Sequence, residues 1–166
     1  MDEFSVNSPS SVYVGLGSNQ QQPTAQIENA VANLSDIAGT SLREISSQYR
    51  TPAWGMVEQP DFINAVARVE TLQSPIGLLR ALHSIERDMG RVRRQRWAAR
   101  VIDLDVLLFG ALRITSPEVI IPHPWLVQRP FALVPLLEIA PNVRIPGFGP
   151  AAAALLKLDP CKIVKL

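Results

Sequence analysis

Apolar residues recur with two different periods along this chain, and the period separates predicted strands from predicted helices. Residues 12–18 form a short apolar run and residues 61–71 alternate between two faces, so both are predicted strands. Residues 41–51 are a third strand candidate. Residues 27–38 and 76–89 instead carry apolar side chains three or four positions apart, the spacing of an amphipathic helix. The first half therefore predicts the order β-α-β-β-α.

Residues that favour helix ends support these boundaries. Pro23 and Gly39 bracket the first predicted helix. Ser74-Pro75 gives the second helix a capping serine and a first-turn proline, and Gly90 follows its last apolar residue. Both helices therefore have a defined start and end.

The second half predicts a strand at 101–109, a tight turn at Gly110-Ala111 and a hairpin partner at 112–115. Three prolines make 116–124 an irregular connection, and a short helix is expected at 131–139. The order β-α-β-β-α-β-β-α is that of an α+β sandwich, with two helices on a mostly antiparallel sheet.

The composition of the chain narrows the class of protein to which it can belong. The 166 residues form one expected catalytic domain, with 1–10 as a flexible N-terminal extension. The single cysteine excludes an internal disulfide and favours a reducing compartment. The N-terminus lacks the apolar run of a signal peptide, and no apolar stretch approaches the length of a membrane span. We expect a cytoplasmic protein without a membrane partner.

The positive charge is concentrated in one segment. Residues 91–100 hold five arginines and no acid, while the remaining eleven basic residues face fifteen acidic ones. A mildly acidic chain with one basic segment favours a local anion site over a broad nucleic-acid surface. The alternative for the segment is a solvated basic loop.

Asp103 and Asp105 are the strongest chemical signal. Residues i and i+2 of a strand share a face, with Cα atoms ~6.6 Å apart. Two such carboxylates repel each other unless a cation joins them, and Mg²⁺ typically takes one or two carboxylates together with phosphate oxygens and water. A solvated edge or salt bridges to the arginines would explain the pair equally well. Arginines nearby favour a magnesium-bound polyphosphate.

Two further patterns are weaker. Gly15-Leu16-Gly17-Ser18-Asn19 lacks the rest of a dinucleotide fingerprint or P-loop, and its glycines are best explained by a turn after the strand. His123 lies between two prolines, which restrict the backbone. One histidine and one cysteine make no zinc site, and no nucleophile triad is evident.

Five groups of residues, in order, carry a family resemblance. They are Tyr49-Arg50-Thr51-Pro52, Gln59-Pro60-Asp61-Phe62-Ile63-Asn64, Glu86 with Gly90-Arg91-Val92-Arg93, Arg96-Trp97-Ala98-Ala99-Arg100-Val101-Ile102-Asp103-Leu104-Asp105, and Pro122-His123 with Arg129-Pro130-Phe131. Over residues 12–141 the chain resembles the 6-hydroxymethyl-7,8-dihydropterin pyrophosphokinases. The resemblance implies a ferredoxin-like α/β sandwich that moves pyrophosphate from ATP to the pterin hydroxymethyl group, releasing AMP, in folate biosynthesis.

The resemblance also implies roles for individual residues. Asp103 and Asp105 would hold two Mg²⁺ ions, and these two with Arg91 and Arg100 would be catalytic. The ATP site would contain Glu86, Arg91, Arg93, Trp97, Arg100, Val106, His123 and Arg129. The pterin site would contain Thr51, Pro52, Ala53, Trp54, Phe62, Asn64, Trp97 and Phe131. Phe62 and Phe131 could stack on either side of the flat ring, and Asn64 could bind its edge.

Two other functions fit parts of the pattern. An RNA-binding module would use the arginines on phosphates and Trp97 for stacking, but the strands lack its aromatic pattern. A nucleotidyltransferase would pair Gly17-Ser18 with an Asp-x-Asp, but here the two lie far apart in the sequence. We expect small-molecule substrates, no nucleic acid and a monomer.

Overall fold

The computed structural model describes residues 8–53, 58–91, 100–160 and 162–166. In these residues a six-stranded antiparallel sheet forms the centre, with strand order β10-β3-β4-β1-β5 and β2 also paired to β4. Its strands are β1 (Ser10–Ser18), β2 (Thr40–Ile45), β3 (Tyr49–Thr51), β4 (Phe62–Thr71), β5 (Asp103–Phe109) and β10 (Val164–Lys165).

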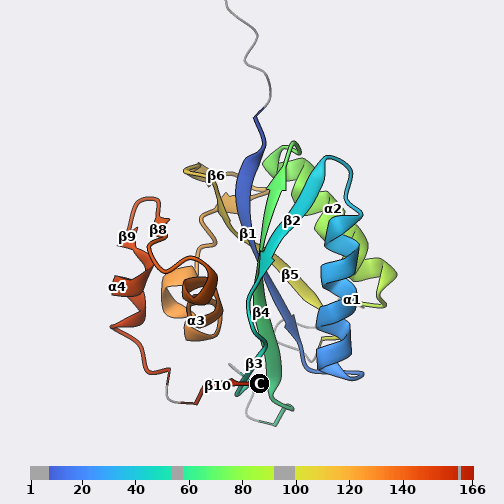
Figure 1. Cartoon of the computed structure of the whole chain (residues 1–166), viewed down its shortest axis with the longest axis vertical. Coiled ribbons are helices and arrows are strands. Elements are labelled where there is room, and N and C mark those ends of the chain that lie inside the picture. Colours follow the sequence, from blue (N-terminus) through green and yellow to red (C-terminus); the bar gives the residue numbers. More distant parts are fainter. Residues whose placement is uncertain (1–7, 54–57, 92–99, 161) are drawn as a thin grey trace, which may run out of the picture.

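Helices cover both faces of this sheet (Figure 1). On one face lie α1 (Pro23–Ser35) and α2 (Pro75–Asp88). On the other lie α3 (Pro130–Ile139), α4 (Ala151–Leu155) and the 3₁₀ helix η1 (Leu126–Gln128). Two small strand pairs complete the fold: β6 (Ile114–Thr115) with β7 (Ile120–Ile121), and β8 (Arg144–Ile145) with β9 (Gly149–Pro150). Within the described ranges no helix has the length and hydropathy that a membrane span requires.

The α+β sandwich with a mostly antiparallel sheet is confirmed, and so is the alternation of faces. On β4, Ile63 and Ala65 enter the core under α1 and α2, whereas Val66 enters the opposite core. The predicted start of α2 is also correct, because the Ser74 hydroxyl accepts a hydrogen bond from the Gly77 N–H at 3.1 Å. The first helix ends at Ser35, and Gly39 turns the chain with φ +67°.

The structure corrects three predictions. The expected hairpin after β5 does not form, because Ile114 and Thr115 pair with Ile121 and Ile120 instead of β5. The segment 116–124 is therefore not wholly irregular. The strand expected at 41–51 is divided into β2 and β3, since the Ser46 hydroxyl takes the hydrogen bond of the Val66 N–H. No element was predicted after residue 141, where the structure forms β8, β9, α4 and β10.

Glu138 of α3 joins that helix to β3 and β10. Its carboxylate accepts hydrogen bonds from the Ser47 N–H, the Ser47 hydroxyl at 2.7 Å and the buried Tyr49 hydroxyl at 2.5 Å. Lys165 of β10 approaches the same carboxylate at 3.4 Å. Burial raises the pKa of Tyr49 to about 12, helped by its bond to Glu138. Burial alone would raise the pKa of Glu138, but these partners together lower it.

Glu138→Gln tests this junction. At neutral pH the variant should unfold more easily, because a neutral amide is a weaker acceptor than a carboxylate. The folded-state pKa of Glu138 lies below its ordinary value of 4.5. Its stabilisation is therefore complete above that ordinary value and is lost as pH falls through the lower, folded-state pKa. Urea unfolding at several pH values should show the difference from the parent protein shrinking in acid. Exposed Glu28→Gln on α1 is the control, and a pH-independent difference would contradict the assignment.

Candidate active site

Strand β1 separates two sets of predicted site residues. Gly17 of β1 lies opposite Asp103 of β5 on one side and opposite Asn64 of β4 on the other. Directly opposed residues share a face of the sheet. The carboxylate pair and the predicted pterin residues Phe62 and Asn64 therefore project from one face, at the end of the sheet where β5 begins.

From the sequence, the glycines of β1 were assigned to a turn, and this assignment is wrong. The strand continues through Gly15 and Gly17 to Ser18. A Cβ atom at Gly17 would come within 2.9 Å of the Asn64 Oδ1 atom, so glycine is needed for the close approach of that side chain. In the sequence, two glycines spaced two positions apart in a buried strand could have indicated that the site lies on that strand.

Asp103 is surrounded by arginines. Arg91 donates from Nη1 to Asp103 Oδ1 at 2.7 Å, and Arg100 bonds Asp103 Oδ2. The same Arg91 nitrogen also bonds Glu86, a buried residue of α2 whose Oε1 accepts from the Leu104 N–H at 2.8 Å. Glu86 therefore holds Arg91 against β5. Salt bridges to arginines were considered from the sequence as an alternative explanation for the aspartate pair, and such salt bridges do exist at Asp103.

Asp105 has a different environment. Its Oδ2 atom lies 3.5 Å from Arg129 Nη1 and 3.8 Å from His123 Nε2. Loss of solvation, followed by the charge of Asp103, raises the pKa of Asp105 to about 7, although Arg129 and Arg100 oppose this shift. The two carboxylates therefore differ: Asp103 is paired with cations, while Asp105 holds a proton more readily.

His123 is neutral at physiological pH. Burial and the nearby Arg129 lower its pKa to about 4. Its Nδ1 atom accepts a hydrogen bond from the Trp125 N–H at 3.1 Å, and its Nε2 atom lies 3.5 Å from Arg129 Nη1 and 3.8 Å from Asp105 Oδ2. The His123 N–H bonds the Leu107 carbonyl at 2.9 Å, which attaches this segment to β5. His123 is thus held in place beside Arg129 and Asp105.

The predicted pterin residues lie across β1 from the carboxylates. Asn64 Nδ2 donates to Thr51 Oγ1 at 2.7 Å, so β3 and β4 are joined at the site. Phe62 is half-buried, and Phe131 begins α3 with its ring centroid 5.7 Å from the Arg129 guanidinium carbon. Pro52 is exposed just beyond β3. These contacts connect the two parts of the site.

Some predicted site residues are not placed there. Val106 lies in the core under α1 and α2, on the face of β5 opposite the carboxylates, so only its backbone is available to a ligand. Ala53 is half-buried next to Pro52. Trp54, Arg93 and Trp97 lie outside the described residues.

The carboxylate oxygens of Asp103 and Asp105 are ligands that suit Mg²⁺. No group of three or more His, Cys, Asp or Glu side chains that could hold a metal occurs in the described ranges. Two carboxylates on one face are nonetheless the usual protein share of a Mg²⁺ site, whose remaining ligands are phosphate oxygens and water. Asp103 and Asp105 therefore fit Mg²⁺ that binds together with a phosphorylated ligand.

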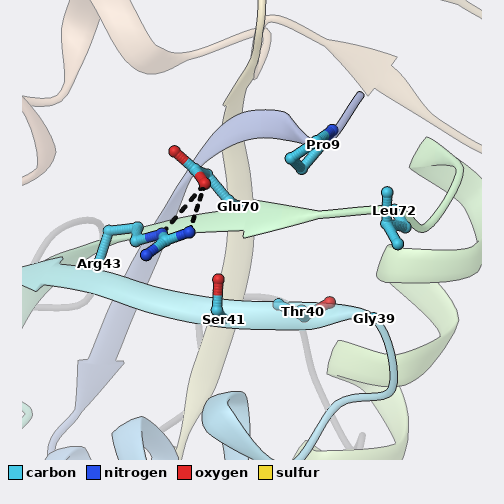
Figure 2. Close-up of a pocket in the computed structure, with 7 residues that line it drawn as sticks. All are labelled: Pro9, Gly39, Thr40, Ser41, Arg43, Glu70 and Leu72. Carbon is cyan, nitrogen blue, oxygen red and sulfur yellow. Dashed lines mark hydrogen bonds and ion pairs between the residues drawn. The ribbon is translucent and has the colours of Figure 1, made fainter. Parts of the chain in front are cut away.

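A surface hollow lies at the other end of the sheet (Figure 2). It is lined by Pro9, Gly39, Thr40, Ser41, Arg43, Glu70 and Leu72. Arg43 Nη2 bonds Glu70 Oε2 at 2.8 Å, so the charges that line it are already paired. It offers no chemistry like that of the carboxylate pair.

An α+β sandwich whose sheet carries paired carboxylates and converging arginines defines an enzyme that binds a phosphorylated ligand. A family model described as 7,8-dihydro-6-hydroxymethylpterin-pyrophosphokinase (HPPK) matches residues 13–141, and the chain belongs to this family. Membership favours the enzyme over the RNA-binding module and the nucleotidyltransferase considered from the sequence.

Curated relatives and solved structures agree. A 2-amino-4-hydroxy-6-hydroxymethyldihydropteridine pyrophosphokinase of Methylorubrum extorquens is 42% identical over 93% of this chain and 97% of its own length. The Haemophilus influenzae protein of the same name is 39% identical over 93% and 96%.

A crystal structure described as HPPK-DHPS in complex with substrates matches with a TM-score of 0.75 at 13% identity, over 90% of this chain and 43% of that chain. Plasmodium falciparum HPPK-DHPS matches with a TM-score of 0.69 at 14% identity, over 92% and 42%. At such identities the likeness shows the fold alone. The chain spans less than half the length of these two proteins.

The charge arrangement predicts how Asp105 titrates. Without divalent cations, Asp105 should have a pKa of about 7. Asp103→Asn should lower this pKa because it removes a like charge, and Arg129→Gln should raise it because it removes an opposite one. Carboxyl carbon shifts in an NMR titration would measure both. Equal pKa values in the parent and both variants would contradict the arrangement.

Proposed function

We propose that this chain transfers the pyrophosphate group of ATP to the hydroxymethyl group of 6-hydroxymethyl-7,8-dihydropterin, releasing AMP, as a Mg²⁺-dependent enzyme of folate biosynthesis. One observation carries the proposal. The arginine-flanked carboxylates and the side chains of Phe62 and Asn64 project from the same face of the sheet, on either side of Gly17. A phosphate donor and a flat acceptor can therefore meet above β1.

The transfer has a simple balance of bonds. The hydroxymethyl oxygen attacks the β-phosphorus of ATP and loses its proton, and the bond from that phosphorus to the α,β-bridging oxygen breaks. AMP leaves with this oxygen and its electron pair. The protein has little covalent work to do, so positioning and charge stabilisation supply most of the rate.

Arg91 and Arg100 are placed to stabilise the charge on the phosphates. Both contact Asp103, and Arg91 also contacts Glu86. Guanidinium groups bind phosphate oxygens through two parallel hydrogen bonds. When ATP binds, we expect these arginines to exchange Asp103 for phosphate oxygens, while Glu86 keeps Arg91 against β5. Arg129 and neutral His123 lie beside Asp105 and would contact the nucleotide from that side.

Asp103 and Asp105 would hold two Mg²⁺ ions together with phosphate oxygens. Bound there, the ions would offset phosphate charge and make the substrate hydroxyl more acidic. The exchange of arginine partners expected above would free the Asp103 oxygens for these ions.

Thr51, Phe62, Asn64 and Phe131 would bind the pterin. The Asn64 amide combines a donor and an acceptor, which matches the edge of a ring that carries an amide-like group. Its bond to Thr51 fixes its orientation. Phe62 and Phe131 supply apolar surface for the flat ring. We expect a monomer that acts as one catalytic domain on small molecules and binds no nucleic acid.

The first test identifies the nucleotide product. Mixing the protein with ATP, Mg²⁺ and 6-hydroxymethyl-7,8-dihydropterin should release AMP in step with pterin consumption, because the group transferred is pyrophosphate. Anion-exchange chromatography separates AMP from ADP. ADP as the only product would mean an ordinary kinase, and an absence of turnover would refute the proposal.

A second test separates metal binding from salt bridging at the aspartates. Asp103→Asn and Asp105→Asn keep side-chain size but remove one charge each. Both should fold, and Asp105→Asn should be at least as stable as the parent because its carboxylate is poorly solvated. Turnover should fall on the order of a hundredfold to several-thousandfold, as expected for lost metal-aligned charge stabilisation.

Binding of the pterin should change much less, since the residues predicted to bind it lie on the other side of β1 from the two carboxylates. The control is Asp36→Asn, an exposed aspartate just after α1, which should leave turnover unchanged. Near-normal turnover in either site variant would refute the metal assignment.

A further inference from the structure

Asn19 occupies an unusual position between β1 and α1. Its residue exposure is only 3%, although it lies in a short connection that also contains Gln21 and Gln22 with positive φ values of 52° and 62°. Non-glycine residues rarely adopt this conformation, and two in succession occur where surrounding contacts fix the backbone. Asn19 is therefore buried in a connection whose backbone is held by its surrounding contacts.

Two of these contacts hold Arg100. The Asn19 N–H donates to the Arg100 carbonyl at 3.1 Å, and the Arg100 N–H donates to Asn19 Oδ1 at 2.8 Å. Both backbone groups of Arg100 are thus bonded to one residue. Arg100 in turn bonds Asp103, so its backbone position determines where its guanidinium lies relative to the carboxylates.

The other two contacts hold the chain just before β4. Asn19 Nδ2 donates to Gln59 Oε1 at 3.2 Å and to the Pro60 carbonyl at 3.2 Å. Pro60 lies two positions before Phe62, at the start of the predicted pterin strand. Only an amide side chain has an acceptor for the Arg100 N–H and donors for two carbonyl oxygens. Aspartate lacks the donors, and alanine lacks both.

We propose that Asn19 is a positioning residue that fixes the nucleotide side and the pterin side of the site relative to each other. It does so by bonding Arg100 and residues 59–60 at the same time. The inference rests on the proposed function, because it assigns ATP to the Arg100 side and the pterin to the Phe62 side. A buried asparagine that only stabilised the fold would leave both affinities unchanged in a folded variant, and its replacement would not be coupled to that of Gln59.

The experiment compares Asn19→Ala, Gln59→Ala and the double variant by equilibrium titration with a non-hydrolysable ATP analogue and, separately, with the pterin. Asn19→Ala should weaken both ligands, each by about tenfold, the loss expected for one or two hydrogen bonds. Gln59→Ala should weaken only the pterin. In the double variant the loss of pterin affinity should equal that of Asn19→Ala alone, because the Asn19–Gln59 bond is broken only once.

Asn29→Ala, an exposed asparagine of α1, is the matched control and should bind both ligands like the parent. Should Asn19→Ala not fold, Asn19→Asp replaces it. That variant keeps the acceptor for the Arg100 N–H, so ATP-analogue affinity should fall less than pterin affinity.

Unchanged affinities in a less stable Asn19→Ala, or strictly additive pterin losses in the double variant, would overturn the inference and leave the proposed function intact. A parent protein that binds neither ligand would overturn the proposed function, and the inference with it.

Discussion

Three carboxylates and three arginines meet where β5 begins, and the rest of the site depends on how they are paired. A half-buried charge is tolerable only when a partner compensates for its lost solvation. Glu86 and Asp103 together hold Arg91, and Asp103 also holds Arg100. Asp105 is compensated less well, and its raised pKa is the result. The site therefore gathers three cations beside its carboxylates, and Asp105 is the carboxylate that would gain most from a metal ion.

Much of this could be predicted from the sequence, because the relevant signals are local. Alternation along 61–71 and 101–109 predicted which side chains share a face, and the spacing of Asp103 and Asp105 predicted that both project together. The capping serine at the start of α2 was equally local. These predictions needed only the period of a strand or a helix.

Most of the errors concern partners that are distant in sequence. The predicted hairpin is an exception, because Ile114 pairs with Ile121, seven positions further on, instead of with β5. The glycines of β1 were interpreted as turn residues, since their neighbours Asn64 and Asp103 lie far along the chain. Asn19 was missed for the same reason. Its importance comes from bonds to residues 59, 60 and 100, which no local pattern reveals.

The position of β10 has a consequence for how the protein is made. β10 is the only described strand that covers the outer edge of β3, and it follows β3 in the sequence by almost the whole remaining chain. During synthesis β3 emerges early and its outer backbone groups stay unpaired until β10 appears. An open strand edge can pair with another chain. Until β10 forms, the outer edge of β3, the strand that ends at Thr51, is therefore one place where nascent copies on neighbouring ribosomes can associate wrongly.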